Sequence, residues 1–176
     1  MIGKVYGIPP QPPVEDRTHR VPAGAVTLGV EYRALDPESL RATYADNPEH
    51  LAELEARSPE GGFTDEGVSL HVWGTDDGHE YVRFDVFADE PHYHYVHNTG
   101  AAGETVNNVI DFDAVASGDM LAWALERLRT RLPEMLQEAG GDAVAAAVDP
   151  DMVARAVGEV ERLAVLTMDV VDGPRF

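Results

Sequence analysis

The sequence predicts an α+β fold in which an antiparallel sheet of about five strands is packed by C-terminal helices. Two observations support this class. Four segments of alternating apolar and polar residues follow one another between residues 67 and 114, with turn residues between them. After residue 117 the apolar positions recur every three or four residues, which is the period of an amphipathic helix.

The N-terminal part of the chain is expected to contribute an arm, one strand and two short helices. Prolines in residues 1–22 favour an extended arm. Residues 26–35 alternate as a half-buried strand does, and Asp36-Pro37 and Asn47-Pro48 each place a capping side chain before a proline that can begin a helix. We therefore expect a single domain over residues 23–171, preceded by the arm and followed by a tail of residues 172–176.

The central region is predicted to form a four-stranded meander. Asp77-Gly78 favours a tight hairpin after the first of these strands, because glycine accepts a positive φ. The four segments are "GVSLHVW" (67–73), "HEYVRFDVFAD" (79–89), "HYHYVHN" (92–98) and "ETVNNVIDFDA" (104–114).

The C-terminal region is predicted to be helical. Ser117 is the expected cap of a leucine-striped helix that Pro133 should kink or split, because proline removes a backbone hydrogen bond. Asp149-Pro150 begins the last helix, whose end, "LAVLTMDVV" (163–171), fits a helix or a strand equally well.

Composition limits the possible partners. The chain carries 13 basic and 32 acidic side chains, a formal net charge of −19, which disfavours binding to nucleic acid or to an anionic membrane. This acidity fits a salt-adapted or acidic proteome, a basic protein partner, or mimicry of DNA. The sequence has no cysteine, which excludes disulfides and thiolate chemistry. Without an apolar leader segment, the expected location is cytoplasmic.

Histidines are concentrated on one predicted strand. Residues two apart on a strand share a face, so His92 and His94 point the same way. Counting through the following turn places His94 opposite Val109 and His92 opposite Asp111. Asn107, Asp113 and Asp85 are expected near the same face, whereas Tyr93, Tyr95, Val106, Ile110 and Phe112 are expected on the core face.

Two imidazoles and a carboxylate form a plausible ligand set for Zn, Fe, Mn, Ni or Cu. The expected ligands of such a divalent transition metal are His92, His94 and Asp111. The pattern is similar to the His-x-His strand of cupin-like metal barrels, although His97 or Asn98 replaces their following Glu and no second histidine motif is present. A small-molecule pocket without metal, or a solvated or partner-facing surface, also fits these residues. His71, Trp73 and His79 are expected at the surface.

These observations lead to two hypotheses about function. The first is a small-ligand-binding or metal-dependent catalytic domain, which holds a small polar ligand in a cleft between the sheet and the C-terminal helices. Its expected ligand-binding residues are His92, His94, Tyr95, Asn108 and Asp111. The second is a non-enzymatic acidic accessory or interaction protein, or a homo-oligomer, that uses its sheet face or C-terminal helices to bind a protein partner.

Overall fold

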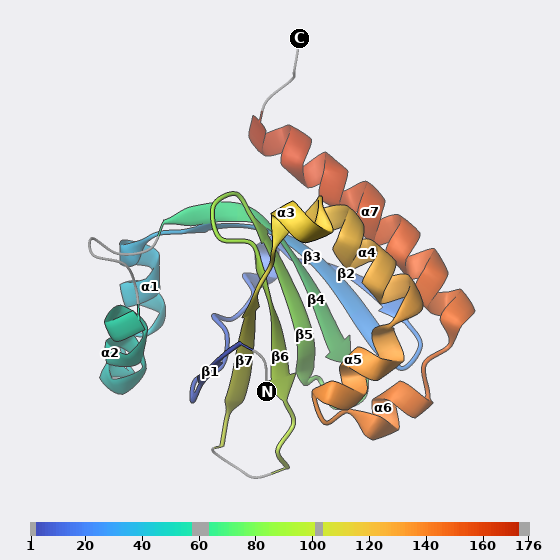
Figure 1. The fold of residues 1–176 in the computed structure, drawn as a ribbon, viewed down its shortest axis with the longest axis horizontal. Coiled ribbons are helices and arrows are strands. Elements are labelled where there is room, and N and C mark those ends of the chain that lie inside the picture. Colours follow the sequence, from blue (N-terminus) through green and yellow to red (C-terminus); the bar gives the residue numbers. More distant parts are fainter. Residues whose placement is uncertain (1–2, 58–63, 101–103, 173–176) are drawn as a thin grey trace.

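A computed structural model describes residues 3–57, 64–100 and 104–172 and shows a single antiparallel sheet (Figure 1). Over these residues the sheet has seven strands in the order β1-β7-β6-β5-β4-β3-β2. The strands are β1 (Lys4–Tyr6), β2 (His19–Ala23), β3 (Val26–Leu35), β4 (Asp65–Gly74), β5 (Glu80–Phe87), β6 (His92–His97) and β7 (Val106–Asp111). The predicted α+β class is therefore confirmed.

The expectation of about five strands was too low, because the two edge strands come from the N-terminal region. β1 pairs with β7, and β2 pairs with β3. β1 has only three residues, and its partner lies about a hundred positions away, so no local pattern indicates the pairing. β2 contains Pro22, which an edge strand tolerates because one of its sides needs no hydrogen-bond donor.

The central meander has the predicted register. His94 lies opposite Val109 and His92 opposite Asp111, so the register counted from the sequence is confirmed. The hairpin between β4 and β5 contains Gly78 at a φ of 67°, as an Asp-Gly turn requires. Because both ends of the sheet are free edges, it does not close into a barrel of the cupin type.

The helices begin largely where the sequence predicts. α1 and α2 start at the two expected prolines, and Pro133 separates α4 from α5. Ser117 does not cap α4, because it ends the short α3; Asp119 accepts from the Ala122 backbone N–H instead, at 2.8 Å. The helices are α1 (Pro37–Thr43), α2 (Pro48–Arg57), α3 (Ala114–Ser117), α4 (Met120–Thr130), α5 (Leu132–Glu138), α6 (Asp142–Ala146) and α7 (Pro150–Asp172), with a 3-10 turn η1 (Glu15–Arg17).

The ambiguous C-terminal run is helical, since α7 continues to Asp172, the first residue of the expected tail. The remaining tail residues, 173–176, lie outside the described part of the chain. Among the helices of the described residues, none is both long enough and apolar enough to cross a bilayer.

The two faces of the sheet have different covers (Figure 1). Helices α4 to α7 pack on one face and enclose the apolar core, in which Leu28, Leu70 and Phe84 from the sheet are fully buried. On the other side lie α1, α2 and residues 7–14, which we call the N-terminal strap. The strap contacts α1 through Gln11 and Thr43, and α2 through Gly7 and Glu53. The polar face of the sheet therefore lies beneath a second layer of chain.

Candidate functional site

The polar face of the sheet is buried instead of solvated. Side chains that point away from the helical layer would be expected to face water on a two-layer protein. His71 and Trp73, expected at the surface, are only 1% and 5% exposed, so that expectation was wrong. The buried polar residues on this face are Glu31, Arg33, Asp65, Ser69, His71, Arg83, Asp85, His94 and Asn107.

Two buried arginines hold the N-terminal strap against this face. Arg83 donates from Nη1 to the backbone carbonyl of Gln11 at 2.8 Å, and Arg33 donates from Nη2 to the Gln11 side chain at 2.9 Å. The backbone N–H of Val14 donates to Glu31 at 3.1 Å. Charge-assisted hydrogen bonds of this kind fix the strap in place and exclude bulk water from most of the polar face.

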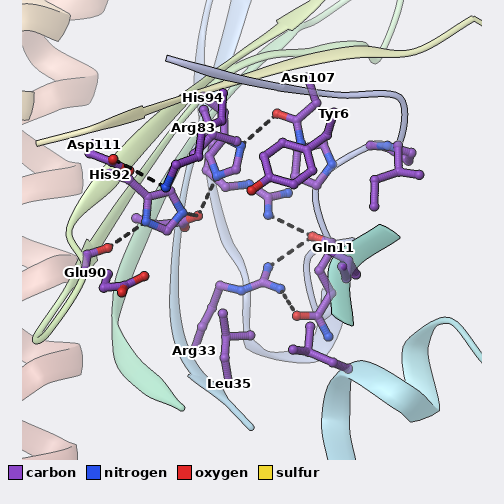
Figure 2. Close-up of a pocket in the computed structure, with 18 of the residues that line it drawn as sticks. Tyr6, Gln11, Arg33, Leu35, Arg83, Glu90, His92, His94, Asn107 and Asp111 are labelled. Atoms are coloured by element: carbon purple, nitrogen blue, oxygen red, sulfur yellow. Dashed lines mark hydrogen bonds and ion pairs between the residues drawn. The ribbon is translucent and has the colours of Figure 1, made fainter. Parts of the chain in front are cut away.

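A cavity of about 190 Å³ remains between the strap and the sheet (Figure 2). Its floor is polar and includes Asp85, His92, His94 and Asn107. Its opposite wall is largely apolar and is built from Ile8, Leu35, Leu40, Tyr44 and Leu54. A cavity with an apolar wall and a few converging polar groups is typical of small-molecule sites.

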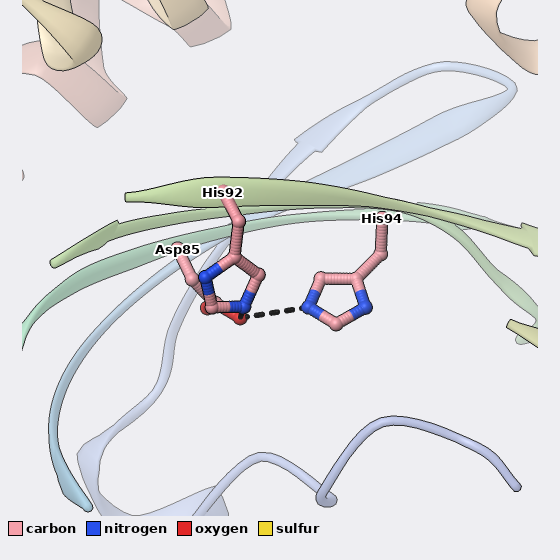
Figure 3. Close-up of side chains that lie close together, drawn as sticks. All are labelled: Asp85, His92 and His94. Carbon is pink, nitrogen blue, oxygen red and sulfur yellow. Dashed lines mark hydrogen bonds and ion pairs between the residues drawn. The ribbon is translucent and has the colours of Figure 1, made fainter. Parts of the chain in front are cut away.

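Asp85, His92 and His94 form a compact cluster on the floor of this cavity (Figure 3). Asp85 on β5 lies directly opposite His92 on β6. One carboxylate oxygen, Oδ2 of Asp85, lies 3.0 Å from Nε2 of His94 and 3.3 Å from Nε2 of His92. The other, Oδ1, accepts a short hydrogen bond from the Ser69 hydroxyl. The three possible ligand atoms all lie within 4.8 Å of one another.

The outer nitrogen of each histidine is held by a carbonyl oxygen. Nδ1 of His92 lies 2.7 Å from the backbone oxygen of Glu90, and Nδ1 of His94 lies 2.8 Å from Oδ1 of Asn107. A carbonyl oxygen only accepts, so each Nδ1 must carry the proton. In the neutral ring, Nε2 then presents a lone pair, and both Nε2 atoms lie close to the same ionised carboxylate oxygen. This arrangement favours a cation between the three groups.

Burial and mutual contact set the protonation of the cluster. Burial alone would raise the pKa of Asp85, but the adjacent His92 and His94 rings hold that pKa well below its ordinary value. Burial lowers the pKa of His94. Burial would also lower the pKa of His92, but its hydrogen bond and ion pair with Asp85 raise it above the ordinary value. The anionic Asp85 and neutral His94 are in the states that metal ligands require, and in the metal-free protein a proton on His92 supplies the balancing charge.

The expected site residues divide between the two faces of the sheet. His92, His94 and Asp111 all line the cavity, but the Asp111 carboxylate is mostly exposed and pairs with Lys4 at 3.5 Å. It is not part of the cluster, in which Asp85 supplies the carboxylate. Tyr95 and Asn108 line a separate cleft against α4 and α5, on the opposite face. The expected cleft beside the helices is present, but the histidines do not face it.

A second polar cluster on the same face was not predicted as a site. His71 lies between two carboxylates, with Nε2 3.0 Å from Glu31 and Nδ1 2.6 Å from Glu80. Glu80 also forms a two-point ion pair with Arg83, through bonds of 2.9 and 2.7 Å. The sequence did contain a signal for this cluster, which is the row of charged residues at the outward positions of three adjacent strands. If such a row is buried, its members must pair with one another, because unpaired buried charges are costly.

Sequence comparison adds a family but no activity. Residues 20–164 match a family described as a domain of unknown function (DUF7700). The chain belongs to this family. The matched residues include Asp85, His92 and His94, whereas the N-terminal strap precedes the match. No curated protein and no solved structure matches the chain.

Proposed function

We propose that Asp85, His92 and His94 bind one divalent transition metal, and that the bound metal holds a small polar molecule in the adjoining cavity. The observation that carries the proposal is the convergence of two Nε2 atoms on one oxygen of Asp85, with each Nδ1 fixed by a carbonyl acceptor. Histidine ligands of metals are commonly oriented in this way, by a hydrogen bond from the second ring nitrogen.

The spacing of the three groups suits a metal. Nitrogen and oxygen ligands lie about 2.0 to 2.2 Å from zinc, so two neighbouring ligands are about 3.0 Å apart at a right angle and about 3.4 Å apart in a tetrahedron. The separations of 3.0 and 3.3 Å between Oδ2 of Asp85 and the two Nε2 atoms fall in this range, and all three ligand atoms lie within 4.8 Å of one another.

The ligand types narrow the metal and its chemistry. Two imidazole nitrogens and one carboxylate oxygen suit Zn, Fe, Mn, Ni or Cu better than Mg or Ca, which prefer oxygen. Three protein ligands leave coordination positions for water or a substrate, and Asp85, His92 and His94 all line the cavity. A metal with such an open position can polarise a bound carbonyl or activate water. The proposal therefore favours a metal-dependent enzyme, in the cytoplasm, over a passive carrier.

A second candidate function is partner binding or self-association through the C-terminal helices. Val165 and Leu166, adjacent on α7, are 45% and 48% exposed, and they supply an apolar spot on an otherwise acidic surface. Light scattering at low and high salt tests this alternative. A strict monomer under both conditions would count against self-association.

Metal titration tests the main proposal. Protein freed of metal with a chelator should bind one equivalent of Co²⁺ or Zn²⁺, and at a hundred times the dissociation constant the metal should stabilise the fold by about 2.7 kcal/mol. A His92→Ala/His94→Ala variant should show neither effect. The matched control is His19→Ala/His50→Ala, which removes two histidines that do not line the cavity. If both variants bind Co²⁺ as the wild type does, the proposal is wrong.

A further inference from the structure

We infer that the molecule held in this cavity is a small organic anion, with its oxyanion at the metal and beside Arg33 and Arg83, and its apolar body against the wall formed by α1 and α2. The inference rests on the proposed metal site and adds the chemical class of the ligand.

Unused hydrogen-bond donors lie around the metal ligands. A guanidinium group has five N–H donors. Arg83 uses Nε and Nη2 on Glu80 and Nη1 on Gln11, while Arg33 uses only its two terminal nitrogens. Within the described part of the chain, Nε of Arg33 has no acceptor, and neither has the side-chain amide nitrogen of Asn107. Both arginines line the cavity and point toward Gln11 (Figure 2). Spare donors of this kind are best satisfied by an oxyanion.

The charges around the cavity also favour an anion. The charged side chains that line the cavity are three basic groups, Lys4, Arg33 and Arg83, and three acidic groups, Asp85, Glu90 and Asp111. These fixed charges are balanced in number, so a divalent metal leaves an excess of about two positive charges. An anionic ligand would neutralise this excess.

The size and the apolar wall limit the rest of the ligand. At about 190 Å³ the cavity is smaller than the roughly 300–1,000 Å³ of pockets that hold drug-sized molecules. A nucleotide or a folded peptide would not fit. Leu40 of α1, Tyr44 just after α1 and Leu54 of α2 line the cavity and offer a surface for a short hydrocarbon or single-ring body. A monocarboxylate with one ring has the right size and polarity.

Three probes that share one ring test the charge preference. Cobalt-loaded wild-type protein should bind benzoate at least tenfold more tightly than benzyl alcohol or benzylamine, as measured by calorimetry. Only benzoate should change the visible absorption of the bound cobalt, because only it places an anionic oxygen on the metal. Metal-free protein should bind benzoate at least tenfold more weakly. This comparison requires no variant.

Variants then locate the anion. Arg33→Met should lower the affinity for benzoate at least tenfold, while Co²⁺ still binds with one-to-one stoichiometry. Leu40→Glu, at a half-buried position on α1, provides a second test if the arginine variant does not fold. It places a carboxylate in the apolar wall, which should weaken the binding of an anion with an apolar body. Arg127→Met, on the helical side of the sheet, is the matched control and should leave benzoate affinity unchanged.

The outcomes separate the two proposals. If Co²⁺ binds but the three probes bind equally, or the amine binds best, the inference about an anion is overturned and the metal site stands. If Co²⁺ does not bind at the histidines, both are overturned. Benzoate binding that is unaffected by Arg33→Met and by Leu40→Glu would place the probe outside this cavity and would also overturn the inference.

Discussion

The buried carboxylate of Asp85 contacts Ser69, His92 and His94. Asp111, on β7 at the other side of β6, instead faces solvent and pairs with Lys4. Both aspartates lie directly opposite His92, one on each neighbouring strand. The sequence placed both aspartates near the histidine face, and Asp111 was the metal ligand that it predicted. Counting residues through the turns predicts which residues lie opposite each other on neighbouring strands. It does not predict which of their side chains the overlying strap shields from water.

Substituting the two aspartates separates these alternatives. Asp85→Asn should lower the affinity for Co²⁺ at least a hundredfold, because the amide removes the only negative ligand of the cluster. Asp111→Asn should change it by no more than about threefold, since a charge that faces solvent is screened. Calorimetric titration of the chelator-treated proteins measures both. Equal losses would show that Asp111 is a ligand.

The neighbouring asparagines give a second matched pair. Asn107 accepts from Nδ1 of His94, while Asn108 points to the opposite face, where its Oδ1 has no hydrogen-bond partner among the described residues. Loss of a group that orients a metal ligand typically lowers metal affinity by about 10- to 100-fold. We expect this loss for Asn107→Ala and no comparable loss for Asn108→Ala, measured by competition with a chromogenic chelator. The reverse order would mean that His94 is not oriented through Asn107.

Three adjacent strands are joined across the polar face by a row of charges. Glu31 on β3, His71 on β4 and Glu80 on β5 contact one another in sequence, and Arg83 extends the row toward the cavity. Burial alone would raise the pKa of Glu80, but Arg83 and His71 lower it from the ordinary 4.5 to about 2. Ionised Glu80 is therefore part of what stabilises this region of the sheet.

The shift in Glu80 predicts how stability depends on pH. The folded state binds the Glu80 proton more weakly than the unfolded state, so the stabilisation is present above pH 4.5 and is lost as pH falls from 4.5 toward 2. The full shift corresponds to about 3 kcal/mol. Urea unfolding at a series of pH values should show a shallower slope in this range for Glu80→Gln than for the wild type. Glu66→Gln, at an exposed position on β4, is the control and should keep the wild-type slope.

Predictability differed between kinds of element. The Asp-Pro and Asn-Pro helix starts, the break at Pro133 and the meander register depend on residues within a few positions of one another, and the sequence predicted all of them. β1 could not be predicted, because its pairing with β7 depends on a contact across almost the whole domain. The burial of the polar face could not be predicted for the same reason, since it depends on long-range contacts that place the proline-rich strap over the sheet.

The whole molecule combines a strongly acidic surface with a buried network in which charges are nearly balanced. Surface ion pairs such as Arg129–Glu161 exist, but the 32 acidic residues greatly outnumber the 13 basic residues with which they could pair. Their mutual repulsion opposes folding, and salt should relieve it. The buried row is screened much less, because water and ions do not enter it.

Salt should therefore stabilise this protein. Between 0.01 M and 1 M salt the Debye length falls from about 30 Å to about 3 Å, which removes most repulsion between separated surface charges. Exposed ion pairs weaken as well, but each contributes only about 0–1 kcal/mol, so relief of the net charge of −19 should dominate. The melting temperature should rise by several degrees, equally in NaCl and KCl, because screening does not distinguish the two cations. Unequal shifts would indicate specific ion binding, and a fall in melting temperature would mean that the surface pairs outweigh the repulsion.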